Sequence, residues 1–346
     1  MPPFCVTAAL SVRLGCYRLP SGRLLPAPTS VTALEIEVAL EGLEYIGRDG
    51  RSYRFAVDSR LLQVGVPECL SALGISKALS GRLRAQNRVS LDLSTATLTL
   101  TASSEIEPSG GRFERFCTAY GEPTVLFEDD FLLALDKPAG VLVHGDGTGQ
   151  PTLSDAACGL LVRHEELLAL QAVQRLDVPT TGVVLFSKAV EFQGLFDALV
   201  ADHTRMTKRY LAVVAGAYPC ARDRIDAPIG RDRHDARKMR VCAAGTGQDS
   251  CTEVERLAVA PDKSASLLLV TLRSGRKHQI RVHLARRGFP ILGDALYATG
   301  QASRGPLMLH AWSELFAHPI TGQAVSITAP SIERFEGMFP GAADVL

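Results

Sequence analysis

Apolar residues recur along the chain mainly at the spacing of β-strands. These runs predict strands at residues 33–40, 53–57, 91–101, 125–127, 131–135 and 208–214, and further extended structure at 141–143. The strands do not alternate regularly with helices. The pattern therefore argues against a doubly wound parallel sheet.

Two segments have helical spacing instead. A helix is predicted over residues 154–170, with Ser154 as its N-cap. A second helix is predicted from an apolar stripe at positions i, i+3, i+4, i+7 and i+8, formed by Phe192, Leu195, Phe196, Leu199 and Val200. We interpret that stripe as core and assign it no functional role.

The composition of the chain changes at residues 108–111, Pro-Ser-Gly-Gly, which predicts a linker. A chain of 346 residues is long for one domain, so two are expected. The expected division is a strand-rich N-terminal domain of unknown role (1–108), a linker (109–122), a second domain (123–331) and a C-terminal tail (332–346). Within the first, the cations Arg82, Arg84 and Arg88 could contact an anionic partner or form an ordinary solvated surface.

The most informative stretch is residues 174–182, Gln-Arg-Leu-Asp-Val-Pro-Thr-Thr-Gly, which directly precedes the apolar run 183–186. A loop interrupted by Pro and Gly, next to a buried strand, can present the carboxylate of Asp177 from a rigid support. The alternative is that Asp177 only caps a turn, as Asp often does beside Pro.

Charge is balanced overall but not locally. Lys+Arg and Asp+Glu both total 37, and the pI is about 7.1, which argues against a protein that simply coats nucleic acid. Cations nevertheless concentrate at residues 205–240 and 273–287. They suggest an anionic substrate steered to this half of the chain, although two ordinary solvated faces would look the same.

Several other classes of site are not indicated. The eight cysteines form no C-x-x-C pair, which favours free thiols in a reducing cytoplasm over a zinc ribbon or a disulfide framework. The first 25 residues do not have the pattern of a signal peptide, and no apolar run is long enough to span a bilayer. His278 and His283 are five residues apart, so neither a strand nor a helix would direct them to one metal. The glycines at 145, 147 and 149 lack the Lys and the helix start of a phosphate-binding loop.

Seven motifs follow one another between residues 123 and 330. They are residues 135–144, Arg175-Leu176-Asp177 with Thr181-Gly182, Lys208-Arg209-Tyr210, residues 275–283, Gly293-Asp294 with Tyr297, residues 309–312, and His318-Pro319. Their order and spacing resemble those of the RluA family of RNA pseudouridine synthases. Residues 1–120 lie outside the resemblance, and we do not recognise in them the S4 RNA-binding domain that many members carry.

The resemblance implies an isomerase that converts a uridine already in RNA to pseudouridine. It implies an α+β fold with a mixed, largely antiparallel sheet and an RNA-binding cleft. No metal or organic cofactor is expected, because the reaction has no redox step and loses no leaving group. Large-subunit ribosomal RNA is the expected substrate, with transfer RNA as the alternative, and the enzyme is expected to be a cytoplasmic monomer.

The same resemblance implies roles for three residues. Asp177 would act at the sugar as nucleophile or base, Tyr210 would stack on the target base, and Arg281 would hold the aspartate ionised and oriented. Contacts to RNA are expected from Arg175, Lys208, Arg209, Arg237, Lys238, Arg276, Lys277 and Arg286. His278 and His283 are interpreted as structural.

This chain departs from the usual family pattern at two places. Gln174 stands where relatives commonly have His, and Val178-Pro179 where a charged pair is frequent. Neither position belongs to the expected catalytic set, so the departures concern how RNA is held near the site.

Two alternatives of other classes remain at this stage. One is an RNA-binding protein that keeps the fold without the chemistry, which the intact set Asp177, Tyr210 and Arg281 disfavours. The other is a metal-dependent hydrolase of a phosphorylated small molecule, which the spacing of the possible ligands disfavours.

Overall fold

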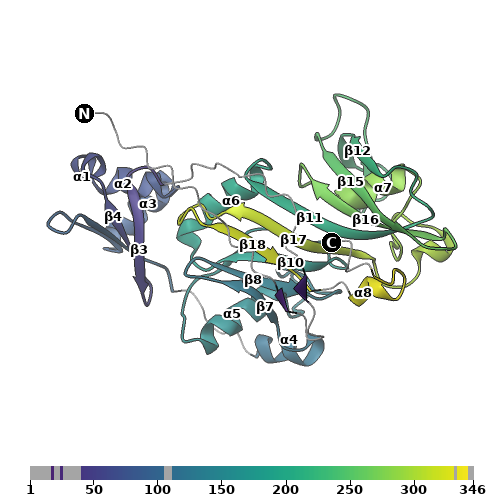
Figure 1. The fold of residues 1–346 in the computed structure, drawn as a ribbon. Coiled ribbons are helices and arrows are strands. Elements are labelled where there is room, and N and C mark those ends of the chain that lie inside the picture. The colour runs from purple at the N-terminus through teal and green to yellow at the C-terminus, as the bar shows by residue number, and fades with distance from the viewer. Residues whose placement is uncertain (1–16, 19–23, 26–39, 105–110, 331–332, 342–346) are drawn as a thin grey trace.

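The structure is a computed structural model that describes residues 17–18, 24–25, 40–104, 111–330 and 333–341. The strand predicted at 33–40 lies outside the described residues except for Leu40. Figure 1 shows a small N-terminal sheet (purple) at one end of the molecule, and the strands β12 and β15 with helix α7 at the other.

A ten-stranded sheet is the largest sheet among the described residues (Figure 1). Along its main path the strands are β12 (Arg222–Asp226), β15 (Cys251–Val259), β16 (Ala265–Leu272), β11 (Met206–Ala215), β17 (Leu309–Ala317), β10 (Thr181–Ser187), β8 (Leu132–Lys137) and β7 (Thr124–Glu128). In addition, β18 (Ala324–Thr328) pairs with β17, and β9 (Gln171–Ala172) pairs with β10. Only the pair β10–β17 is parallel among these described strands. The expected α+β fold with a largely antiparallel sheet is confirmed.

The central strand β10 is buried on both faces, which explains its continuous apolar run. Val183 and Leu185 belong to one core cluster, and Val184 and Phe186 belong to another on the opposite face. The strand predicted at 208–214 lies within β11, and the runs at 125–127 and 131–135 fall in β7 and β8. The extended structure expected at 141–143 is not assigned as a strand.

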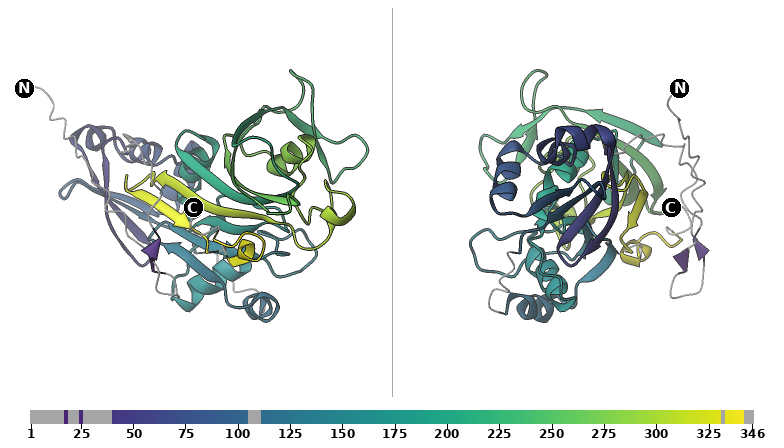
Figure 2. Two further views of the ribbon diagram at one scale, coloured as in Figure 1. Left: turned by 45° about the vertical axis from the view of Figure 1, so that its right-hand side comes forward. Right: turned by 90° about the vertical axis from the view of Figure 1, so that its left-hand side faces the viewer.

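Helices α4 (Arg112–Tyr120) and α5 (Leu153–Arg163) lie side by side against one face of β8 and β10, as both views of Figure 2 show. Most of the linker expected at 109–122 is therefore a docked helix, with Phe113 and Phe116 buried. The docking is close, because a Cβ on Gly159 would come within 2.0 Å of the Phe113 ring. Aromatic burial decides the conformation of this segment more than the Gly-rich stretch before it.

The boundaries predicted for α5 are wrong at both ends. Its N-cap is Thr152, whose hydroxyl accepts the Asp155 N–H in a capping box, whereas the Ser154 hydroxyl donates to Val143 O. The helix ends at Arg163 and not at residue 170. Glu165 has a φ of 61°, a left-handed conformation in which the helix cannot continue.

The amphipathic helix predicted around residue 196 is confirmed as α6 (Gln193–Ala201), preceded by the 3₁₀ turn η1 (Val190–Phe192). Phe192, Phe196 and Leu199 are buried in the largest core cluster. The stripe therefore belongs to the core.

The N-terminal sheet has the order β3 (Leu43–Asp49), β4 (Ser52–Val57), β6 (Thr97–Thr101) and β5 (Val89–Asp92). The strand predicted at 53–57 is β4, whereas the run 91–101 is a hairpin of two strands. Three short helices that the strand-rich expectation missed lie between β4 and β5: α1 (Ser59–Val64), α2 (Val66–Ala72) and α3 (Lys77–Ala85). Of the basic residues noted here, Arg82 and Arg84 are exposed, but Arg88 donates to the buried Glu191 at 2.5 Å.

Aromatic packing joins the N-terminal sheet to the rest of the molecule. The Tyr53 ring lies 5.1 Å from the Phe131 ring and 5.0 Å from the Phe192 ring, measured between centroids. These residues belong to one continuous cluster with β8, β10 and α6. The expected N-terminal domain thus shares its core with the larger sheet.

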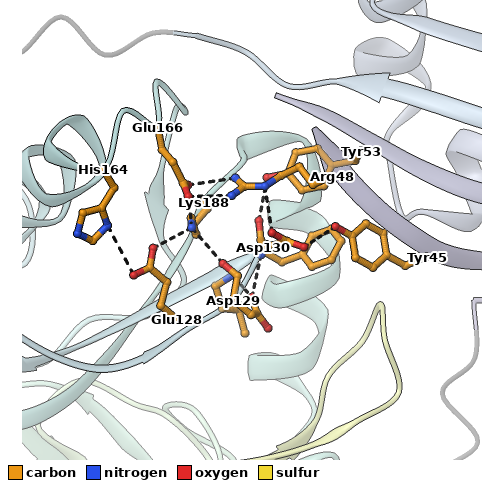
Figure 3. A network of polar contacts seen from close by, with 11 residues as sticks. Tyr45, Arg48, Tyr53, Glu128, Asp129, Asp130, His164, Glu166 and Lys188 are labelled. Carbon is orange, nitrogen blue, oxygen red and sulfur yellow. Dashed lines mark hydrogen bonds and ion pairs between the residues drawn. The ribbon is translucent and has the colours of Figure 1, made fainter. Parts of the chain in front are cut away.

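A polar network lies at the same junction (Figure 3). Arg48 on β3 contacts Asp130 at 3.1 Å and Glu166 at 2.8 Å. Lys188, only 2% exposed, contacts Glu166 at 2.8 Å and Glu128 at 2.9 Å. Because each buried charge has opposite charges around it, the network fixes how the two sheets are oriented to one another.

The remaining described elements are β1 (Tyr17–Arg18), β2 (Leu24–Leu25), β13 (Ile229–Arg231), β14 (Met239–Val241), α7 (Gln279–Arg286), η2 (Gly300–Ser303) and α8 (Glu333–Glu336). Part of the tail expected at 332–346 is packed, since Phe335 and Phe339 are buried against Leu211 and Trp312. No helix in the described ranges is long and apolar enough to cross a membrane.

Candidate active site

A cleft of about 1830 Å³ opens where the loop before β10, strand β11 and the start of α7 come together. Asp177, Tyr210 and Arg281 all line it, although they are far apart in the sequence. The cleft is larger than the roughly 300–1,000 Å³ of a typical small-molecule pocket.

The loop that carries Asp177 is fixed by its own backbone. Val178 O accepts hydrogen bonds from Lys137 Nζ at 2.9 Å and from Gly140 N at 2.9 Å. Gly182 then brings β10 against β17 with a φ of 110°, where a Cβ would lie 2.1 Å from Ala311 O. Both features hold the carboxylate of Asp177 at the cleft, where its side chain is 25% exposed.

The turn at Asp177 is made by its backbone and not by its carboxylate. Thr180 N donates to Asp177 O at 3.0 Å. The side chain is therefore not the turn cap that the alternative interpretation required, and it is available for the cleft.

One oxygen of Asp177 is held and the other is open. Oδ2 accepts from Arg281 Nη1 at 2.8 Å, and His278 Nε2 faces the same oxygen at 3.6 Å. Oδ1 has no hydrogen-bond partner within the part of the chain that the structure describes. The carboxylate can therefore present Oδ1 to a substrate while Oδ2 is fixed.

Arg281 is buried and is shared between two acids. It is 3% exposed, and its Nε and Nη2 donate to the two oxygens of Asp294 at 2.8 Å each. Burial opposes the charge, but the hydrogen bonds and charges of Asp294 and Asp177 outweigh it and raise the pKa of Arg281. Two nitrogens of the guanidinium therefore pair with Asp294, and Asp177 receives only Nη1. Asp294 is the main functional residue that sequence reasoning missed, although the motif Gly293-Asp294 was noted.

The start of α7 is fixed to β15 by Gln279. Its amide donates to Cys251 O and to Thr252 Oγ1, both at 2.9 Å. Its carbonyl oxygen accepts from Ser274 Oγ at 2.8 Å and from Arg276 N at 3.0 Å. A fully bonded buried amide of this kind determines where the helix begins, and thus where Arg281 points.

The first residue before α7, His278, adopts the left-handed conformation with a φ of 57°. Its ring faces Asp177, so His278 is not only the structural residue that the sequence predicted. His283 has the expected structural environment: it is fully buried, its Nδ1 pairs with Thr252 Oγ1 at 2.9 Å and its Nε2 with Ala227 O at 2.9 Å.

Tyr210 lies on β11 and is 8% exposed, with its ring at the cleft. Burial raises its pKa, so the phenol keeps its proton at neutral pH. Lys208 is on the same face two residues earlier, since side chains in a strand alternate. It is 7% exposed, and burial lowers its pKa. Lys208 is thus a buried residue of the cleft wall, and the RNA contact expected of it stays a prediction.

The expected RNA contacts separate into two groups. Those that line the cleft are Arg175, Lys208, Arg237, Arg276 and Lys277. Those absent from its described lining are Arg209, Lys238 and Arg286. Arg209 differs from Lys208 because it points to the opposite face of β11. Arg286 differs because it lies in the last turn of α7, away from the helix start.

Lys137, beneath the Asp177 loop, is fully buried. Its Nζ donates to Pro138 O at 3.0 Å in addition to Val178 O. Burial lowers its pKa to about 7, although the nearby carboxylates of Asp177 and Asp136 act in the opposite direction. Among the described residues there is no group of three or more His, Cys, Asp or Glu side chains that could hold a metal ion.

Comparison with known proteins agrees with this geometry. The family described as RNA pseudouridylate synthase matches residues 131–286. The chain is 34% identical over 212 residues to "Uncharacterized RNA pseudouridine synthase YhcT" of Bacillus subtilis (strain 168), covering 61% of this chain and 69% of the relative. It is 32% identical over 322 residues to "Ribosomal large subunit pseudouridine synthase D" of Nitrosomonas europaea, covering 82% and 91%.

Among solved structures, "Human RNA Pseudouridylate Synthase Domain Containing 1" has the same fold. The TM-score is 0.51 at 24% sequence identity, over 60% of this chain and 83% of that one. The chain therefore belongs to the family of RNA pseudouridylate synthases, and within it to the RluA family, so it is an isomerase that acts on uridine in RNA.

Proposed function

We propose that this enzyme isomerises a uridine of large-subunit ribosomal RNA, with Asp177 as the group that acts at the sugar. The observation that carries the catalytic assignment is the contact between Asp177 Oδ2 and Arg281 Nη1 at 2.8 Å inside the cleft. The substrate assignment is supported by the relative named for the ribosomal large subunit, which aligns over 82% of this chain.

In the reaction the N-glycosidic bond breaks, the uracil turns, and the base rejoins the same sugar through carbon. Asp177 acts through Oδ1 as nucleophile or base, because Oδ2 is held by the guanidinium. A neighbouring cation favours the ionised carboxylate that either role needs. Tyr210 receives the extruded base on its ring, as aromatic side chains do for unstacked bases.

Extruding a base from its stack costs roughly a few kcal/mol. Contacts of Arg175, Arg276 and Lys277 with flanking phosphates offset this cost, since all three cations line the cleft and are exposed. Lys208 contributes at the buried wall. Arg209, Lys238 and Arg286 would contact RNA only outside the cleft.

Residues 1–108 are proposed to act as a domain that selects or orients the RNA, fixed to the catalytic part by the Arg48 network. We propose that the enzyme acts as a monomer in the cytoplasm, where its thiols stay reduced.

The test is a map of pseudouridine in ribosomal and transfer RNA from cells that lack the protein. The cells are rescued with the wild type or with Asp177→Asn, which keeps the shape of the side chain without its charge. One lost site in large-subunit RNA, restored only by the wild type, is expected. A lost site in transfer RNA would support the alternative substrate. No lost site in either RNA would contradict the proposed function.

A further inference from the structure

Tyr297 lies behind the pair formed by Asp177 and Arg281. Its hydroxyl has two partners, Met239 N at 2.7 Å and His278 Nδ1 at 2.8 Å. The Arg281 guanidinium carbon is 5.2 Å from the centre of its ring. One side chain thus contacts both groups that face Asp177 Oδ2.

The protons of this chain of contacts can be assigned. Burial raises the pKa of Tyr297 to about 12, so its hydroxyl keeps one proton at neutral pH. The Met239 N–H can only donate, so the phenol oxygen accepts there and its own proton is left for His278 Nδ1. The opposite assignment would leave the proton of this half-buried hydroxyl without an acceptor among the described residues.

That assignment also decides which nitrogen of the His278 ring carries the proton. Burial lowers the pKa of His278, against the raising effect of Asp177, so the ring is neutral at neutral pH. A neutral imidazole that accepts at Nδ1 carries its proton on Nε2. Nε2 is the nitrogen that faces Asp177 Oδ2 at 3.6 Å. The Tyr297 hydroxyl therefore selects the tautomer that turns an N–H toward the catalytic carboxylate.

The other partner of Tyr297 belongs to a basic hairpin. Met239 is the first residue of β14, which pairs with β13 and closes the loop 231–240. This basic loop carries Arg231, Arg233, Arg237, Lys238 and Arg240 against only Asp232 and Asp235. Arg237 reaches the lining of the cleft. The loop is thus anchored on the same hydroxyl that orients His278.

We propose that Tyr297 is a positioning residue. Its hydroxyl holds both the basic loop 231–240 and the His278 ring in fixed positions relative to Asp177. RNA held by the loop then meets a carboxylate whose Oδ2 is fixed. The inference rests on the proposed catalytic role of Asp177. It differs from a purely structural role of Tyr297, in which only the stability of the fold would depend on the hydroxyl.

The test is Tyr297→Phe in the full-length protein, which keeps the ring beside Arg281 and removes only the hydroxyl. The substrate is total RNA from cells that lack the enzyme. The single-turnover rate at saturating RNA should fall by about 10-fold or more, because small misplacements of a catalytic group cost this much. The Kd for RNA should change by less than about threefold. A wild-type rate in a folded Tyr297→Phe enzyme would overturn the inference.

A double-mutant cycle separates positioning from stability. His278→Ala and Tyr297→Phe should be strongly non-additive, so that the double variant is about as slow as the slower single variant. Rate losses that multiply would overturn the proposal, since the two residues would then act independently. Thermal unfolding of each variant gives the folded fraction by which the rates are normalised.

Tyr218→Phe is the matched control. Tyr218 is buried, and its hydroxyl donates to Asp223 at 2.7 Å, whereas the Tyr297 hydroxyl contacts His278. Its rate should equal that of the wild type, and an equal loss in both variants would overturn the proposal. If Tyr297→Phe does not fold, His278→Asn takes its place, because it keeps an acceptor for the hydroxyl and loses the nitrogen facing Asp177. A wild-type rate in that variant would overturn the inference, whereas an inactive wild type would overturn the proposed function with it.

Discussion

Asp294 accepts hydrogen bonds from both Nε and Nη2 of Arg281, at 2.8 Å each, and so forms a bidentate pair with the guanidinium. Asp294 is itself held by the backbone N–H groups of Leu296 at 3.0 Å and Tyr297 at 3.1 Å. The Asp177 carboxylate therefore accepts a hydrogen bond only from the third nitrogen of Arg281, Nη1. An acid with no access to the substrate determines where the cation points.

Asp294→Asn is expected to lower both stability and activity. The amide offers one oxygen instead of two and carries no charge, so the buried Arg281 loses the acid that holds two of its nitrogens and keeps only Asp177. Breaking a buried pair in this way costs about 3 kcal/mol or more. Urea unfolding and single-turnover assays measure the two effects. Glu255→Gln is the control, since Glu255 pairs with the exposed Arg222 at 3.3 Å, and such surface pairs are worth less than about 1 kcal/mol. Equal stability of Asp294→Asn and wild type would contradict the role of Asp294.

Gly182→Ala is expected to destabilise the protein by about 3 kcal/mol or more, because the new Cβ would lie 2.1 Å from Ala311 O. The pairing of β10 with β17, and with it the position of Asp177, would have to change. Gly140→Ala is the matched control: its φ is also positive, at 85°, but no atom lies within 4 Å of the added Cβ. The control should cost only about 1–2 kcal/mol of backbone strain. Similar melting temperatures for the two variants would refute the close approach of the strands.

The buried Lys137 is expected to make stability rise with pH in the alkaline range. Its pKa is lowered from 10.5 to about 7 by burial, so between these values the unfolded chain binds a proton that the folded chain does not. The free energy of unfolding therefore increases from pH 7 toward 10.5, by at most about 1.4 kcal/mol per pH unit. Urea unfolding across this range should show a smaller slope for Lys137→Met. Lys77 is exposed, so Lys77→Met is the control and should keep the wild-type slope. Equal slopes for Lys137→Met and Lys77→Met would argue against a neutral Lys137.

RNA binding is expected to depend strongly on salt despite the neutral net charge. Lys277 is exposed and lines the cleft, whereas Lys263 is exposed at a turn outside the described lining. Lys277→Gln should reduce the slope of log Kd against log salt by about 0.7–0.9, the value for one phosphate contact. Lys263→Gln should leave it unchanged. Equal slopes for the two variants would show that Lys277 does not contact an RNA phosphate.

Sequence periodicity was sufficient for the elements whose burial follows a regular local pattern. The run before Ser187 predicted the buried strand β10, and the stripe from Phe192 to Val200 predicted α6. Periodicity failed for α4 and for the three N-terminal helices, because each is short and depends on packing against distant residues. It also failed for the end of α5, where a left-handed residue stops the helix.

By itself the sequence determined the family and the position of a carboxylate in a loop before a buried strand, and it led to the roles that we propose for Asp177, Tyr210 and Arg281. Those properties depend on residue type and on order along the chain. Only the tertiary structure decided that Arg281 donates two hydrogen bonds to Asp294 and one to Asp177, that Lys208 is buried, and that Tyr297 contacts both a basic loop and the site. Asp177 and Arg281 are 104 positions apart. Contacts over such separations, and the burial that shifts pKa values, arise only when the chain is packed, because no local pattern specifies which distant group will be the partner.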